Sequence, residues 1–185
     1  EAINITSFTS NVAPVQEIGT NISSITLTWK LSQPATEQFI NDVPVTGSSF
    51  TFDTLFNSNK SFTLKVNDGT TIKSKTIDIK FMNNIYYGVS SSTTYDSSFI
   101  ESLTKELRQA TEMNFRVNAG KDEYICFAYP SHYGEAVFSV GGFEGGFREV
   151  AKFYYTNESG YNEQYIVYCS DNPCLGDTRV KVIYV

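Results

Sequence analysis

The first 81 residues alternate apolar and polar side chains with a period of two. Residues Ile25–Leu31 place four apolar side chains, Trp29 among them, on one face, and Ser61–Val66 repeats the pattern. Asn67-Asp68-Gly69 then forms a hairpin signal, and residues 71–81 supply the return strand. Further short strand patterns occur at Asn4–Phe8, Gln38–Ile40, Pro44–Val45 and Ser49–Phe52. About seven short strands punctuated by Gly and Pro predict an immunoglobulin-like β-sandwich with Trp29 in its core.

Strand patterns continue after a short joint at Met82-Asn83-Asn84. One strand is predicted at Ile85–Val89, and six more follow at regular intervals: Asn114–Asn118, Glu123–Tyr129, Ala136–Val140, Glu149–Thr156, Glu163–Cys169 and Thr178–Tyr184. This spacing predicts a second antiparallel β-sandwich. The strand Glu163–Cys169 is apolar or aromatic on both faces, so we expect it to be covered on both sides. Either a helix of the same chain or a neighbouring chain could provide the second cover.

One helix is predicted between these strands. Its apolar stripe comprises Phe99, Ile100, Leu103, Leu107 and Ala110. Ser98 and Glu101 fit a capping box, with Asp96 as the alternative N-cap. Glu101 and Lys105 have the spacing of a favourable i,i+4 pair. The sequence therefore predicts an all-β protein with one added α-helix.

The aromatic composition changes sharply between the two halves of the chain. All 12 tyrosines lie at or after Tyr86, whereas Ser, Thr and Asn supply the polar side chains before it. Tyrosine suits binding surfaces as well as cores, because its rigid apolar ring ends in a polar group. We therefore expect two domains: residues 1–82, an immunoglobulin-like spacer or docking domain, and residues 83–185, a Tyr-rich β-sandwich with one helix that provides the distal binding or assembly surface.

The charge of the chain disfavours some classes of partner. The formal net charge is −6, with six basic and seven acidic groups in residues 1–81, and eight basic and thirteen acidic groups in residues 82–185. Nucleic-acid binding requires clustered Lys and Arg, so no nucleic-acid partner is expected. No segment approaches the roughly 20 apolar residues that span a membrane, so membrane insertion is not expected either.

The cysteines give no metal-site pattern. Cys126 lies in an apolar strand, where a buried free thiol is the usual outcome. Cys169 and Cys174 flank a turn and could either form a disulfide or stay reduced. Three thiols and the single His132 lack the paired spacing of a zinc site, and Asp171–Asp177 lacks EF-hand spacing. We expect neither a metal nor a cofactor.

The most distinctive local motif is the glycine-rich segment Val140–Phe147, with the sequence VGGFEGGF. A phosphate-binding loop is one interpretation, but the Lys-Ser/Thr ending is missing and no helix pattern follows. A long hairpin turn whose two aromatic residues fold onto the sheet is favoured. A third interpretation is an exposed loop whose Phe143 and Phe147 contact a partner.

Catalytic constellations are weak. His132 could serve Ser131 or a cysteine as a base, but adjacent residues on a turn rarely face each other correctly. Glu144 with Glu149, and Asp122 with Glu123, could be the carboxylate pair of a glycosidase. With thirteen acidic residues in this half of the chain, such pairs arise by chance. We therefore expect a protein that is not an enzyme.

Taken together, these segments resemble the C-terminal modules of bacteriophage tail, baseplate or fibre structural proteins. The segments that carry the resemblance are Ile25–Leu31, Phe62–Gly69, Ile77–Phe81, Ile85–Ser90, Phe115–Gly120, Tyr124–Pro130 and Val140–Phe147. The resemblance implies a virion protein that is assembled in the bacterial cytoplasm and has no catalytic residues. It also implies other virion proteins as partners, a glycan or protein of the host cell surface as a further partner, and a homotrimer as the oligomer.

The predicted contact residues lie in loops of the second half. They are Phe143, Glu144 and Phe147, with His132, Tyr133 and Tyr161 on turns that we expect to be neighbouring. Exposed aromatic side chains serve host attachment and virion assembly equally well. A purely structural assembly or decoration module is therefore one alternative, and a glycan-cleaving carbohydrate-active domain is a second.

Overall fold

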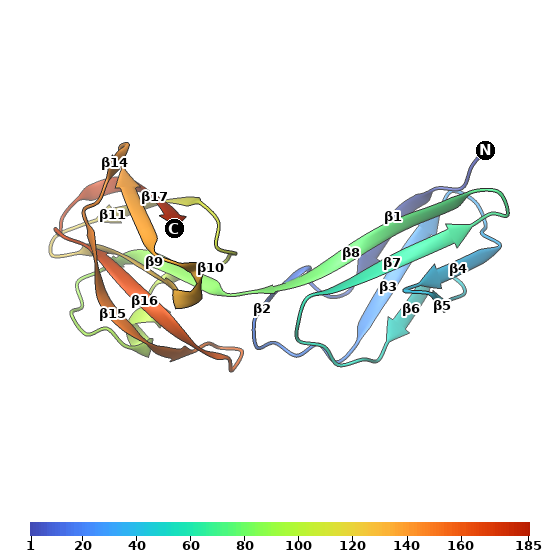
Figure 1. The fold of residues 1–185 in the computed structure, drawn as a ribbon, viewed down its shortest axis with the longest axis horizontal. Coiled ribbons are helices and arrows are strands. Elements are labelled where there is room, and N and C mark those ends of the chain that lie inside the picture. The colour runs from blue at the N-terminus through green and yellow to red at the C-terminus, as the bar shows by residue number, and fades with distance from the viewer. The chain divides into compact units, whose positions relative to one another are not determined.

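The computed structural model describes all 185 residues and is all-β, as predicted. It contains strands β1 to β17, one α-helix of five residues and one 3₁₀ turn (Figure 1). The strands form four sheets with antiparallel pairing. No helix is long and apolar enough to cross a membrane. The chain divides into two compact units, Glu1–Phe81 and Met82–Val185.

The first unit contains two sheets. The first sheet contains, in order across the sheet, β1 (Ile5–Ser10), β3 (Ile25–Leu31) and β6 (Ser49–Phe52). The second sheet contains, in order, β2 (Val15–Glu17), β8 (Ile72–Met82), β7 (Lys60–Asn67), β4 (Glu37–Ile40) and β5 (Val43–Pro44). Every strand predicted from the alternating pattern is present. The pattern missed β2, whose three residues are too few to show alternation.

Side chains from both sheets share one core in this unit. Alternate residues of β3 and of β7 are buried, because successive side chains of a strand point to opposite faces. Trp29 is 1 % exposed and is the core tryptophan that the sequence predicts. Its indole Nε1 donates a 2.8 Å hydrogen bond to Oε1 of Gln38, so its polar atom is satisfied.

The β7–β8 hairpin turns where Asn67-Asp68-Gly69 predicts it, since Asn67 pairs with Ile72. One oxygen of the Asp68 carboxylate accepts hydrogen bonds from the backbone N–H groups of Thr70 and Thr71, at 2.9 and 2.7 Å. The other oxygen accepts from the N–H of Ile3 at 3.2 Å. These hydrogen bonds favour the charged form, and they hold the pKa of Asp68 well below its usual range.

The second unit also contains two sheets. The five-stranded sheet contains, in order across the sheet, β10 (Thr104–Leu107), β9 (Asn84–Ser90), β12 (Tyr124–Pro130), β16 (Asn162–Ser170) and β15 (Phe147–Thr156). The four-stranded sheet contains, in order, β11 (Met113–Ala119), β17 (Gly176–Tyr184), β13 (Ala136–Val140) and β14 (Phe143–Glu144). All seven strands predicted for this half are present. Two further strands, β10 and β14, lie where a helix and a loop were predicted.

The predicted helix is much shorter than its apolar stripe. The helix α1 covers only Ser97–Glu101, and the Asp96 side chain caps it by accepting a 3.0 Å hydrogen bond from the N–H of Phe99. Leu107 lies in β10, and Ala110 is exposed, so neither extends a helical stripe. The edge of β9 offers unpaired backbone groups, and residues 104–107 pair with it instead of continuing the helix.

The strand β16 is covered on both faces, as its sequence predicts. Tyr165 and Val167 pack on one face with Phe99 and Ile100 of α1. Ile166 and Tyr168 point to the other face and pack with residues of β11, β13 and β17. The second cover therefore comes from the same chain, so the aromatic faces of this strand do not require a neighbouring chain.

Candidate functional site

A tight hairpin presents the glycine-rich segment of the second unit. Gly141 and Gly142 form its two-residue loop with φ of 59° and 83°, a conformation that favours glycine and suits hairpins with this loop length. Val140 pairs with Phe143, and Ser139 pairs with Glu144. The segment is a hairpin, as favoured from the sequence, but its loop has two residues, and the long turn that was expected is wrong. The strand β15, not a helix, follows it, so the phosphate-loop interpretation lacks its helix N-terminus.

The ring of Phe143 projects into solvent and is 82 % exposed. Beside it lies a groove of about 430 Å³, and its wall includes Val140, Phe147, Asn172, Leu175 and Thr178. Leu175 is itself 45 % exposed. We call this area the hairpin surface: Val140, Phe143, Glu144, Phe147, Asn172 and Leu175. It combines an exposed ring, an exposed aliphatic side chain and two polar groups.

The second aromatic residue of the motif behaves differently. The ring of Phe147 stacks on Phe138, with ring centroids 4.5 Å apart and planes 17° apart. Phe138 is 3 % exposed, and Phe147 packs against the same core cluster. Phe147 is therefore partly buried against the core and also lines the groove. The structure divides the two predicted aromatic roles, with Phe143 exposed and Phe147 folded onto the sheet.

Glu144 is exposed on the short edge strand β14. It lies between the groove and a smaller hollow of about 180 Å³ that Glu135, Phe138 and Tyr168 also line. No ion pair involves Glu144. Its carboxylate can therefore accept hydrogen bonds from a partner at the rim of the hairpin surface.

Tyr133 and Tyr161 differ in accessibility. Tyr133 belongs to the 3₁₀ turn Ser131–Tyr133 and packs against Tyr184, while its hydroxyl donates to the carbonyl of Arg108. Burial raises the pKa of Tyr133 to about 12. Tyr161 is 41 % exposed, in the turn that leads into β16.

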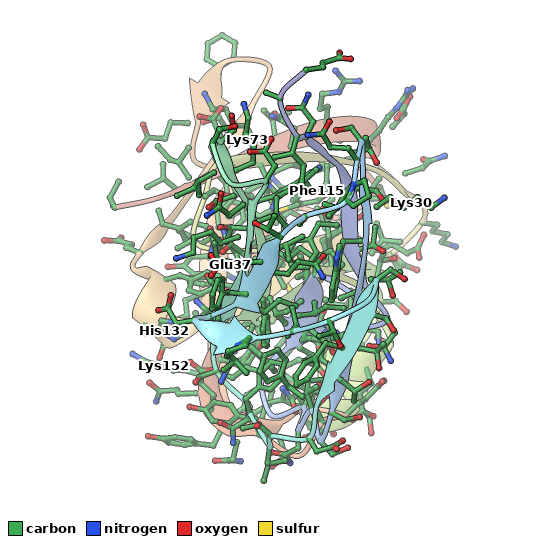
Figure 2. All side chains as sticks on the ribbon, turned by 90° about the vertical axis from the view of Figure 1, so that its right-hand side faces the viewer. Lys30, Glu37, Lys73, Phe115, His132 and Lys152 are labelled. Carbon is green, nitrogen blue, oxygen red and sulfur yellow. The ribbon has the colours of Figure 1, made fainter.

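His132 is exposed at the outside of the ribbon (Figure 2) and pairs through Nδ1 with the carboxylate of Glu163. Ser131 instead donates a 3.1 Å hydrogen bond to the side chain of Gln164. The Ser131 hydroxyl and the His132 ring thus have different partners. The arrangement does not form the nucleophile–base pair considered from the sequence.

The six predicted contact residues do not lie on neighbouring turns, contrary to the expectation. His132 contacts Glu163 near the start of β16, whereas Phe147 pairs with Ser170 at its end. Seven residues separate these positions, which corresponds to roughly 23 Å along a strand. The turn residues His132, Tyr133 and Tyr161 thus form a separate group from Phe143, Glu144 and Phe147. The sequence did not point to Asn172 or Leu175 as contact residues. The only signal in this segment is that Leu175 is an apolar residue within a polar turn.

No group of three or more His, Cys, Asp or Glu side chains could hold a metal ion. The acidic side chains at the two ends of the Asp171–Asp177 segment face arginines instead of each other. Asp177 pairs with Arg116, and Asp171 lies 3.8 Å from Arg148. The hydrogen bonds from Arg116 lower the pKa of Asp177.

Another hollow, about 790 Å³, lies in the first unit. Its wall includes Thr6, Lys30, Gln33, Gln38 and Ser48. The ring of Trp29 borders it but is 1 % exposed, so it offers no aromatic face. The hairpin surface is therefore the better candidate, because its aromatic ring is accessible.

Comparisons with protein-family models, curated proteins and solved structures found no match for this chain.

Proposed function

We propose that this chain is a non-enzymatic attachment module that binds its partner through the hairpin surface. The observation that carries the proposal is the 82 % exposure of the Phe143 ring on a hairpin whose turn has only two residues. A patch that combines an exposed aromatic ring, a second exposed apolar side chain and a groove is typical of a contact site. Short turns keep such a ring in a fixed position, which lowers the entropy lost on binding.

The chemistry of the hairpin surface fits a neutral glycan or a protein loop. The face of Phe143 can pack against the apolar face of a sugar or against an apolar side chain. The amide of Asn172 and the carboxylate of Glu144 can form hydrogen bonds with hydroxyl groups at the rim. An unpaired Glu144 within a unit of net charge −5 disfavours acidic glycans.

The energy available from one such surface is modest. Burying one Phe side chain contributes about 1.5–3 kcal/mol, which alone gives weak binding. Several copies that act together would convert weak contacts into stable attachment. A homotrimer, as expected for a phage fibre or baseplate component, would provide this multivalency.

The resemblance to bacteriophage tail, baseplate or fibre proteins supplies the biological setting of the proposal. In this setting, residues 1–82 form an immunoglobulin-like domain that serves as spacer or docking element. Residues 83–185 form the distal domain, at the surface of the virion, with host glycans or proteins and other virion proteins as partners. Two sheets around a buried Trp29 support the immunoglobulin-like description.

One observation favours a second candidate, a purely structural assembly module. The ten-residue strand β15 is an edge of its sheet, and its Tyr154 is 68 % exposed. An unpaired edge can add a strand from another chain. A bulge between Glu149 and Ala151 interrupts its register, which limits continuous pairing.

Two measurements together distinguish the two candidates. Light scattering gives the solution mass of the chain, and a glycan array and intact bacteria test its binding. A chain that binds, and whose Phe143→Ala variant does not, supports attachment through the hairpin surface. A tight oligomer that binds neither glycans nor cells, and that Tyr154→Lys dissociates, supports the assembly module. Release of sugar from a host polysaccharide would instead support the glycan-cleaving alternative.

A further inference from the structure

Two cysteines face each other at the centre of the five-stranded sheet of the second unit. Cys126 on β12 pairs directly with Cys169 on β16, and their sulfur atoms are 2.9 Å apart. Both residues are buried, at 1 % and 2 % exposure. Directly opposed residues of antiparallel strands have Cα atoms about 4.5–5.5 Å apart, which lies within the range of disulfides.

We propose that Cys126 and Cys169 are a dithiol that oxidises to a cross-strand disulfide, whereas Cys174 stays a free thiol. A disulfide bond is about 2.05 Å long. The two sulfur atoms therefore need to move by less than about 1 Å to form it, and the paired strands already fix both backbones.

The third cysteine has a different role. Cys174 is exposed, and its sulfur accepts a 3.2 Å hydrogen bond from the N–H of Asp122. Its own N–H donates to the carbonyl of Glu123 at 3.0 Å. These contacts hold the turn after β16 against the turn before β12. The Cys169–Cys174 bridge that the sequence left open would break this arrangement and separate Cys169 from Cys126.

The surroundings prepare one of the two thiols for oxidation. A hydrogen bond joins the two sulfur atoms; with Cys169 as its acceptor, it raises the pKa of Cys126 and lowers the pKa of Cys169. Arg148 and the hydroxyl of Tyr95 also lower the pKa of Cys169. A lowered pKa favours the thiolate form of Cys169, and thiolates are the reactive form of cysteine.

Hydrogen peroxide is a sufficient oxidant for the reaction. The Cys169 thiolate attacks one peroxide oxygen, the O–O bond breaks, and hydroxide leaves, so that Cys169 becomes a sulfenic acid. The Cys126 sulfur then attacks the Cys169 sulfur and the S–O bond breaks. The departing hydroxide takes up the proton of Cys126 and forms water. Two thiols and one peroxide thus give one disulfide and two waters.

The bridge would have a structural consequence for the second unit. It would tie β12, the central strand of the five-stranded sheet, to its neighbour β16, and it would close a loop across a separation of 43 residues. This loop contains Phe143 and Phe147 of the hairpin surface. The proposal does not depend on any function of that surface, because it rests only on the two sulfur atoms and their strands.

The test exposes the full chain to hydrogen peroxide, then counts free thiols in denaturant and maps linked peptides by mass spectrometry. We expect a Cys126–Cys169 crosslinked peptide, the loss of both of these thiols, and their recovery on treatment with dithiothreitol. We also expect the thermal midpoint of the tyrosine signal to rise by at least about 5 °C.

Variants separate this bridge from other oxidation products. The number of free thiols in the Cys174→Ser variant should fall from two to none, and its thermal midpoint should rise as in the unsubstituted chain. Cys126→Ala should show neither the crosslink nor the rise. A crosslink that contains Cys174, or three thiols that persist while the folded chain is oxidised, would overturn the proposal. Mapping the unsubstituted chain decides the question even if Cys126→Ala fails to fold.

Discussion

At the residue scale, the Asp68 carboxylate links three segments of the first unit. One oxygen binds the turn backbone at Thr70 and Thr71. The other binds the N–H of Ile3 and the side-chain amide of Gln33, at 3.2 and 3.1 Å. A hairpin residue that sequence patterns mark only as a turn former thus also holds the start of the chain and the segment after β3.

The first prediction concerns acid stability and Asp68. The pKa of this carboxyl is lower in the folded state than its value of 3.8 in an unfolded chain. Its stabilising contribution is therefore fully present above the unfolded pKa and is lost as the pH falls through the folded pKa. We expect Asp68→Asn to lower the urea midpoint of the first unit at pH 7, measured by Trp29 fluorescence. The difference from the unsubstituted chain should shrink as the pH falls below about 4.

Asp53→Asn provides a matched control, since Asp53 is exposed in a loop of the same unit. Its urea midpoint should follow that of the unsubstituted chain at both pH values. An equal loss for Asp68→Asn at neutral and acidic pH would contradict the role of the charged carboxylate.

The second prediction distinguishes the two aromatic residues of the hairpin surface. Phe143→Ala should change the free energy of unfolding by less than about 0.5 kcal/mol, because the exposed ring makes few contacts. Phe147→Ala should cost about 2 kcal/mol, because its stacking on Phe138 and its partial burial are lost. Denaturant unfolding followed by the tyrosine signal measures both, and equal losses would contradict the assignment.

At the element scale, the alternation of apolar and polar residues identified the long strands. In the remaining segments, pairing with other strands of the folded chain decided the secondary structure. Residues 99–107 carry an apolar spacing that fits a helix, yet Thr104–Leu107 pairs with β9. A sequence pattern does not reveal that the edge of β9 is open. The short strands β2 and β14 have a related difficulty, since three or two residues cannot show a period.

The candidate surface could be predicted only in part, for the same reason. The glycines and the strand pattern predict a hairpin at Val140–Phe147. They do not show that Phe143 points outward while Phe147 reaches Phe138, because the chain passes from one sheet to the other between them. They also do not show that His132 lies at the opposite end of β16, or that Leu175 borders the groove.

The third prediction concerns the cap of α1. Asp96→Ala should lower the free energy of unfolding of the second unit by about 1 kcal/mol, because the N–H of Phe99 loses its acceptor. Ser98→Ala should change it by less than about 0.5 kcal/mol, since Asp96 and not Ser98 caps this helix. Urea unfolding followed by tyrosine circular dichroism measures both variants. A larger loss for Ser98→Ala would favour the capping box considered from the sequence.

At the scale of the whole molecule, each compact unit has its own buried core and its own optical probe. Trp29 is the only tryptophan and belongs to the first unit, whereas all 12 tyrosines belong to the second. The core of the first unit is one cluster, and the second unit packs two clusters, one on each face of its five-stranded sheet.

The fourth prediction is that the two units unfold in separate transitions. Leu64→Ala, at a site with 0 % exposure, should cost about 2–5 kcal/mol and lower only the tryptophan transition. Val182→Ala, also at 0 % exposure, should lower only the tyrosine transition. Parallel thermal scans with the two probes measure this. A single shared midpoint that moves equally in both variants would contradict the two-domain proposal.

The attachment function depends most directly on one exposed ring, so the decisive measurement compares three chains for binding to a glycan array and to intact bacteria. These are the unsubstituted chain, Phe143→Ala, and Tyr154→Ala as an equally aromatic control that is 68 % exposed elsewhere in the same unit. We predict at least tenfold weaker binding for Phe143→Ala, equivalent to about 1.4 kcal/mol, and unchanged binding for Tyr154→Ala. Binding that survives Phe143→Ala in the folded protein, or no binding by the unsubstituted chain, would contradict attachment through the hairpin surface.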